Sequence, residues 1–111
     1  MSDGKRWTVQ DRNRREIYLT EERWQHIIAP DGHPEMVDYE QELRLTIRTG
    51  QRTQDSLIPN KYYYIKAFPD LPEGNSHIIA VVLFTFATDE KGCATPNNFV
   101  TTAYQNYIYS H

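Results

Sequence analysis

The fold prediction rests mainly on the stretch HIIAVVLFTFAT, residues 77–88. From Ile78 to Phe86 it is apolar on both faces, which is typical of a central, buried strand. Segments rich in β-branched and aromatic residues flank it, YYYIKAF at residues 62–68 and FVTTAYQNYIY at residues 99–109. The pattern predicts an antiparallel sheet of three to four strands, with residues 78–86 central and a weak strand near residues 53–57.

Two helices are expected before this sheet. Thr20 is a good N-cap for the first helix, which Pro30 ends. Pro34 suits the first turn of a second helix, which should continue to Gly50. Apolar residues recur along it at intervals of three and four, at Met36, Tyr39, Leu43 and Ile47. We expect a core that contains Trp24, Leu43, Ile47, Val82 and Phe84.

The first twenty residues predict a β-hairpin. Residues 6–10 and 15–19 are short and rich in β-formers, and the polar residues between them, centred on Asn13, are typical of a tight turn. With 111 residues, the chain has the length of one domain. The expected fold is therefore a single α+β domain over residues 1–111, with its core at about residues 6–109: a hairpin, two helices and a C-terminal antiparallel sheet.

Composition limits the class of protein but not its partners. Hydrophobic residues make up 39% and charged residues 24% of the chain, which fits a globular core and excludes a disordered composition. The formal charge of −3 does not indicate a nucleic-acid binder by itself. A local basic patch around Arg12 to Arg15 would serve phosphate binding, although such a run is also common in a solvated turn.

Cys93 is the only cysteine, so no internal disulfide or thiolate cluster can form, and a reducing, cytoplasmic location is expected. The first fifteen residues lack the apolar run of a signal peptide. The longest apolar run, residues 78–86, is too short to cross a bilayer as a helix. We therefore expect no membrane role.

Six short motifs follow one another along the chain: IYLT at residues 17–20, ERWQHI at 22–27, HPEM at 33–36, YYY at 62–64, VVLF at 81–84 and VTTAY at 100–104. This order resembles the small phage-type nuclease domains of the barnase, EndoU, colicin tRNase and RelE-like superfamily. The resemblance covers roughly residues 7–107. It implies RNA cleavage without metal, in which the ribose 2′-hydroxyl attacks the adjacent phosphate.

Such chemistry needs a general base, a general acid and groups that stabilise charge on the phosphate. His26 and His33 are candidates because imidazole exchanges a proton near neutral pH. Glu35 would hold the His33 ring at the start of the second helix. Each has a structural alternative, since His26 could pack beside Trp24 and the His33 segment could simply cap a helix.

The last predicted strands supply further candidates. Thr102 and Tyr104 should share one face and Thr101 the other, and their hydroxyls could hold a phosphate. Other candidates for substrate binding are Arg14, Arg15, Lys66 and Tyr64, with Lys66 and Tyr64 on one strand face suited to phosphate neutralisation and base stacking. Thr and Tyr are also ordinary strand residues, and Lys66 suits a solvent face equally well.

No metal-ligand pattern and no nucleotide-binding glycine motif occurs, so neither a metal nor a cofactor is expected. The leading hypothesis is an endoribonuclease of the toxin or phage-effector kind that acts on RNA and is countered by an immunity or antitoxin protein. The alternative is a non-catalytic member of the same fold that binds a protein or RNA, or a structural subunit of a larger assembly. The many acids at residues 31–42 favour this alternative, because they repel phosphate.

Overall fold

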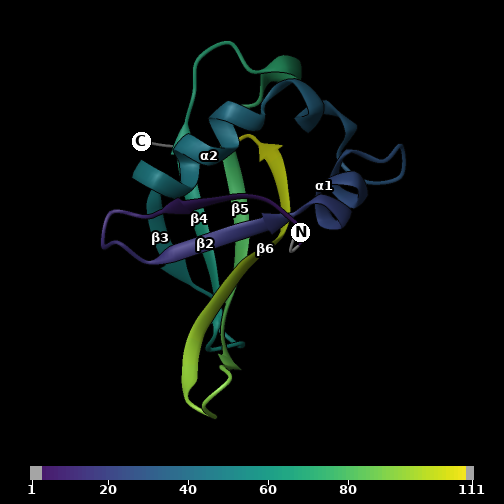
Figure 1. The fold of residues 1–111 in the computed structure, drawn as a ribbon. Helices are drawn as coiled ribbons and strands as arrows, with labels where there is room; N and C mark the ends of the chain where they lie inside the picture. Colours follow the sequence, from purple (N-terminus) through teal and green to yellow (C-terminus); the bar gives the residue numbers. More distant parts are fainter. Residues whose placement is uncertain (1–3, 110–111) are drawn as a thin grey trace.

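The computed structural model describes residues 4–109 and has an α+β fold, with helices on one face of a mixed six-stranded sheet (Figure 1). The sheet order is β1-β2-β6-β5-β4-β3. The strands are β1 (Lys5–Gln10), β2 (Glu16–Thr20), β3 (Gln51–Gln54), β4 (Lys61–Ala67), β5 (His77–Thr88) and β6 (Ala94–Asn106). The predicted α+β class is confirmed, whereas the prediction of three to four strands was too low.

The central strand lies where the apolar run predicts. β5 pairs antiparallel with β4 on one side and with β6 on the other. Ile78, Ala80 and Val82 are fully buried on the helix-covered face, and Ile79 and Val81 are nearly buried on the opposite face. The extra strands arise because β2 pairs in parallel with β6 through Ile17↔Asn98 and Tyr18↔Phe99, which brings the antiparallel β1–β2 pair into the same sheet. At the other edge, β3 begins two residues before the predicted segment.

The first helix, α1 (Glu21–Ile28), begins as predicted, with the Thr20 hydroxyl accepting a hydrogen bond from the Arg23 amide at 3.0 Å. The second predicted helix is split. A 3₁₀ helix, η1 (Pro34–Asp38), precedes α2 (Glu40–Thr49), and Tyr39 between them has φ −125°. The Tyr39 amide bonds to the Met36 carbonyl three residues back, which closes a 3₁₀ turn rather than an α-turn. A second 3₁₀ turn, η2 (Pro72–Gly74), joins β4 to β5.

The core lies between the sheet and the helices. α2 contacts β4, β5 and β1, so the sheet curls around it, while α1 contacts β1, β2 and β6. Trp24, Leu43, Ile47 and Val82 are buried as predicted, but Phe84 is only partly buried. Within residues 4–109, no helix has the length and apolar character to cross a membrane.

A buried carboxylate fixes the β1–β2 turn to β4. Asp11 accepts hydrogen bonds from the Tyr64 hydroxyl at 2.6 Å, from two backbone amides and from the Arg15 guanidinium at 3.2 Å. Burial raises the pKa of Asp11, but hydrogen bonds from Tyr64, Arg15 and Asn13 outweigh it and leave the pKa below its usual value. Burial and this bond raise the pKa of Tyr64. At neutral pH, Asp11 is therefore ionised, and the neutral Tyr64 hydroxyl donates a hydrogen bond to it.

A second polar contact joins β1 to both helices. The Arg6 guanidinium bonds to Glu40 of α2 and, at 2.7 Å, to Glu21 of α1. The Trp7 indole also donates to Glu40, at 2.9 Å. The bond from Arg6 lowers the pKa of Glu40, as does the bond from Trp7, although burial acts against them. This contact anchors the helices to the start of the sheet.

Candidate active site

His33 is held in place by the tight loop that follows α1. The His33 amide donates to the Ile27 carbonyl at 2.6 Å, and the His33 carbonyl accepts from the Met36 amide at 3.0 Å. Gly32 is required for this path, because a Cβ at that position would lie 2.6 Å from the His26 carbonyl oxygen. The backbone thus presents the His33 side chain at the start of η1, beside the C-terminal half of β6.

Three candidate residues meet there. The His33 Nδ1 lies 3.7 Å from the Glu35 carboxylate, and the His33 ring packs against the Tyr104 ring with centroids 5.5 Å apart. All three side chains are partly exposed. We call His33, Glu35, Tyr104 and the neighbouring Thr102 the His33 cluster. Because Nδ1 faces Glu35, the other ring nitrogen, Nε2, lies on the opposite side of the imidazole.

Thr102 belongs to the cluster through strand alternation. Tyr104 pairs with Ile79 and Thr102 with Val81, so both lie on the sheet face away from the helices, whereas Ala103 is buried on the helix face. Thr101 is the extra residue of a bulge between Val81 and Val82. Its hydroxyl donates to the Val81 carbonyl at 3.2 Å. The sheet itself therefore uses the hydroxyl that was predicted to bind substrate.

His26 lies outside the cluster. Its side chain is 64% exposed on the outer surface of α1 and lies 3.8 Å from Glu22 on the next turn. Within residues 4–109, no hydrogen bond, ion pair or ring contact links His26 to His33 or Tyr104. The structure thus separates the two histidines that the sequence places in one candidate set.

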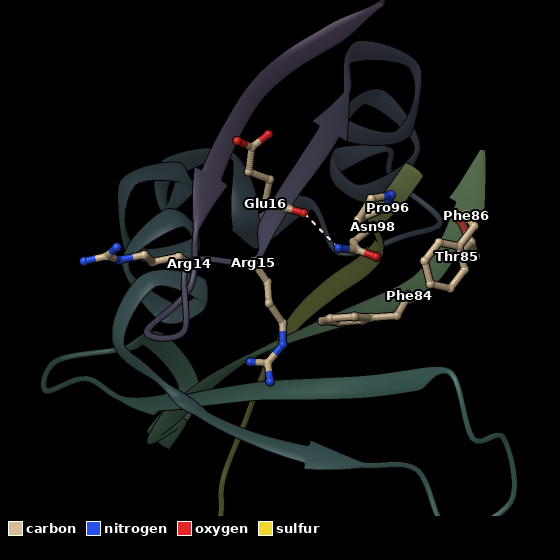
Figure 2. Close-up of a pocket in the computed structure, with 8 residues that line it drawn as sticks. All are labelled: Arg14, Arg15, Glu16, Phe84, Thr85, Phe86, Pro96 and Asn98. Atoms are coloured by element: carbon tan, nitrogen blue, oxygen red, sulfur yellow. Dashed lines mark hydrogen bonds between the residues drawn. The ribbon is translucent and has the colours of Figure 1, made fainter. Parts of the chain in front are cut away.

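The predicted substrate-binding residues occupy three different places. Tyr64 is buried with its hydroxyl on Asp11, so its ring is closed to a substrate base. Lys66 is half-buried on β4. Arg14 and Arg15 line a cavity of about 620 Å³ at the other end of β6, with Glu16, Phe84, Phe86 and Asn98 (Figure 2). Asn98 precedes Tyr104 by six residues, a separation of roughly 20 Å along a strand.

The cavity contains residues that the sequence did not single out. Phe84 and Phe86 were assigned to the central strand and Phe84 to the core, yet β5 continues past the helices and Phe86 is 74% exposed. Asn98 donates to the Glu16 carbonyl at 3.1 Å (Figure 2). Phe84 and Phe86 alternate along β5 where it extends beyond the helices. Such alternation could have indicated an exposed aromatic surface.

Comparison of the chain with protein-family models, with curated proteins and with solved structures gave no match. The site is therefore judged by its own geometry. In the described part of the chain, no group of three or more His, Cys, Asp or Glu side chains is placed to hold a metal ion.

The His33 cluster combines groups that can move protons and donate hydrogen bonds. An imidazole can act as a general acid or base near neutral pH. A phenol and a hydroxyl on the adjoining strand can donate to an anion. The backbone around His33 is fixed by two hydrogen bonds, while the side chains are open to solvent. This combination suits acid–base chemistry on an anionic substrate.

Proposed function

We propose that the chain is a metal-independent endoribonuclease that cleaves RNA at the His33 cluster. The observation that carries the proposal is the His33 imidazole, which lies 3.7 Å from Glu35 and packs on Tyr104 although 71 residues separate the two rings in sequence. These partly exposed contacts add little to the core. The ordered HPEM and VTTAY motifs, which resemble those of phage-type nucleases, contain the same residues.

The proposed reaction begins with proton transfer to His33. As the imidazole takes the proton of the ribose 2′-hydroxyl, the 2′-oxygen forms a bond to the adjacent phosphorus and the bond from phosphorus to the 5′-oxygen breaks. Glu35 stabilises the charged imidazole. Tyr104 gives a proton to the departing 5′-oxygen and regains one from His33 after the products leave. The products are a 2′,3′-cyclic phosphate and a 5′-hydroxyl, and no other reactant is consumed.

Thr102 has a supporting role in this scheme. Its side chain lies on the same sheet face as Tyr104, two residues away, where a hydroxyl can donate to a non-bridging phosphate oxygen. The Tyr104 ring would also offer a surface for an unstacked base. A freely active endoribonuclease would damage cellular RNA, so this function includes an immunity or antitoxin protein as a partner.

The proposal is tested by cleavage of a single-stranded RNA in excess chelator. We expect cuts that leave cyclic phosphate ends, and no cut where one ribose is replaced by deoxyribose, since the attacking hydroxyl is then missing. The matched control is the same oligonucleotide with the deoxyribose moved to an uncut position, which should be cleaved normally. Intact RNA after hours of incubation, or cleavage only with divalent metal, would show that the mechanism is wrong.

A second candidate is an RNA-binding member of the fold without catalysis. It is favoured by the separation of the predicted site residues, because Arg14 and Arg15 line a cavity distant from His33 and His26 lies on the outside of α1. Under this alternative, the arginine cavity would bind RNA and the His33 contacts would have no chemical role. RNA binding with no cleavage by the wild-type protein would support it.

A further inference from the structure

The cavity at the Asn98 end of β6 has walls of two kinds, aromatic and cationic. Its aromatic walls are Phe84 and Phe86 from β5, and Arg15, whose guanidinium donates to Asp11, also lines it (Figure 2). We call this cavity of about 620 Å³ the Phe86 cavity. The Arg14 side chain also lines it but points away from the two rings (Figure 2). The cavity is large enough for a planar ring of nucleobase size.

A stacked aromatic group extends from the Phe86 cavity. The rings of Tyr62 and Phe84 pack with centroids 4.9 Å apart, and the Arg52 guanidinium lies over both, at 4.1 Å from the Tyr62 ring and 5.3 Å from the Phe84 ring. Arg52 comes from the edge strand β3 and is exposed. A cation over partly exposed aromatic rings is an arrangement that serves base stacking and phosphate contact together.

The charge around the cavity is mainly positive. A neighbouring cavity of about 290 Å³ shares Arg15 and adds Arg12 and Arg52 to its lining. The acids of the two cavities are Asp11 and Glu16. Asp11 is buried and already accepts four hydrogen bonds, and the Glu16 carboxylate points away from the rings (Figure 2). Four arginines, Arg12, Arg14, Arg15 and Arg52, therefore line the two cavities, and within residues 4–109 only Arg15 among them is paired with a carboxylate, that of Asp11.

Phe86 lies outside the buried core. It is 74% exposed, whereas the other aromatic residue of the cavity, Phe84, packs on the core. An exposed aromatic ring next to arginines is available for stacking with a ligand base. Single strands fit this surface better than duplexes, because only unpaired bases expose their faces to aromatic side chains.

We propose that the Phe86 cavity is a second RNA-binding site, which stacks one unpaired base on Phe86 and Phe84 while Arg15 and Arg52 contact the flanking phosphates. This inference rests on the proposed function for the identity of the ligand as RNA. It adds a site that lies roughly 20 Å from Tyr104 along β6 and is outside the reacting groups. The site would hold a strand that extends beyond the cleaved bond.

The test is binding of a short, unstructured, fluorescein-labelled 2′-O-methyl RNA, measured by fluorescence anisotropy. This probe has no 2′-hydroxyl proton and cannot be cleaved by the proposed mechanism. Phe86→Ala should raise the Kd by about 5- to 150-fold, the loss expected for one base-stacking contact. Its control is Leu57→Ala, which removes an apolar side chain that is 88% exposed and does not line the Phe86 cavity, and should change the Kd by less than about twofold.

The phosphate contact is tested by the dependence of binding on salt. Arg52→Gln should reduce the slope of log K against log salt by about 0.7, the change expected for one phosphate contact on a single strand. Arg23→Gln makes the same change of charge on exposed α1 and should leave the slope unaltered. Thermal unfolding of each variant confirms that the fold is retained.

The outcomes separate the two proposals. If Phe86→Ala and Arg52→Gln bind the probe like their controls, or if the wild-type protein does not bind it, the Phe86 cavity is not an RNA site, whatever the cleavage assay shows. If the wild-type protein binds the probe and the variants weaken binding, but natural RNA stays intact, the Phe86 cavity stands and the nuclease proposal fails.

Discussion

Two tyrosines of the sheet, Tyr64 on β4 and Tyr104 on β6, each contact a residue far away in sequence, and the contacts differ in kind. Tyr64 is buried, and its hydroxyl donates to the saturated Asp11 carboxylate. Tyr104 is partly exposed and packs on the His33 ring. The Asp11 carboxylate accepts four hydrogen bonds from protein groups, which leaves it little capacity to bind a ligand. The His33 contact leaves polar groups open, so a ligand can use them.

The same distinction separates the two histidines. His26 and His33 each lie near a glutamate, at 3.8 Å and 3.7 Å. Only His33 adds an aromatic partner from another element, the Tyr104 ring of β6. Proximity of an imidazole and a carboxylate therefore does not define a site. We propose the site at His33 because separate elements converge there on one partly open imidazole, which catalysis requires and folding does not.

Of the two tyrosines, Tyr104 is expected to matter more in the cleavage assay, where it is tested by Tyr104→Phe. Loss of the hydroxyl that gives a proton to the departing 5′-oxygen should lower the rate by about 10² to 10⁴. The free energy of unfolding should change by less than about 0.5 kcal/mol, because the ring contact with His33 is kept. Tyr107→Phe, on an exposed side chain next to the end of β6, is the control and should leave both quantities unchanged. An unaltered cleavage rate would remove Tyr104 from the mechanism.

The reverse result is expected for Tyr64→Phe, which should lower the free energy of unfolding by about 1 to 3 kcal/mol in a urea titration. The change leaves the buried Asp11 carboxylate one donor short. Cleavage per folded molecule should stay at the wild-type level. Tyr62→Phe, on the same strand with a half-buried ring, provides the matched control for loss of a hydroxyl. Equal stability of the two variants would show that the Asp11 contact does not hold the fold.

The smallest expected effect is the loss of stability at acidic pH that comes from the contact between Arg6 and Glu40. The Arg6 bond holds the pKa of Glu40 below its unfolded value of 4.5. The ionised form is therefore favoured by folding, and its contribution is present above about pH 4.5 and is lost as the pH falls through the lower, folded pKa. Both side chains are partly exposed, so the contribution is at most about 1 kcal/mol.

Urea titrations at a series of pH values measure this contribution. Stability should decline below pH 4.5, and Glu40→Gln should make the decline shallower than in the wild type. Glu22→Gln, at a carboxylate that is 88% exposed, should leave the decline as it is. A decline of the same steepness in both variants would assign the acid sensitivity to other carboxylates, with Asp11 as the next to test.

Local signals in the sequence predicted much of the fold. The Thr20 cap, the central position of residues 78–86 and the burial of Leu43 and Ile47 follow from cap chemistry and periodicity. The break at Tyr39 did not follow, because it depends on a 3₁₀ turn that the apolar spacing of the segment does not reveal. The parallel β2–β6 pairing rests on two residue pairs far apart in sequence, and no local pattern encodes it.

The candidate site was predictable only in part, for the same reason. His33 and Glu35 are neighbours in sequence, so their proximity could be anticipated, whereas their meeting with Tyr104 depends on how η1 lies against β6. The separation of His26 from this group could not be predicted, since either face of α1 can carry a histidine. Phe86 was hidden in an apolar run that continues beyond the helix-covered part of the sheet.

The most direct test of the His33 cluster is the ratio of the cleavage rates of His33→Ala and His26→Ala, measured on one RNA in excess chelator. Each variant removes an imidazole that lies near a glutamate, so a difference between their rates reports the effect of the other groups around His33. We predict that His33→Ala is slower by about 10² to 10⁴, the usual contribution of a general acid or base, while His26→Ala stays near the wild-type rate. Equal rates in two folded variants, or a larger loss in His26→Ala, would contradict the assignment of the active site to the His33 cluster.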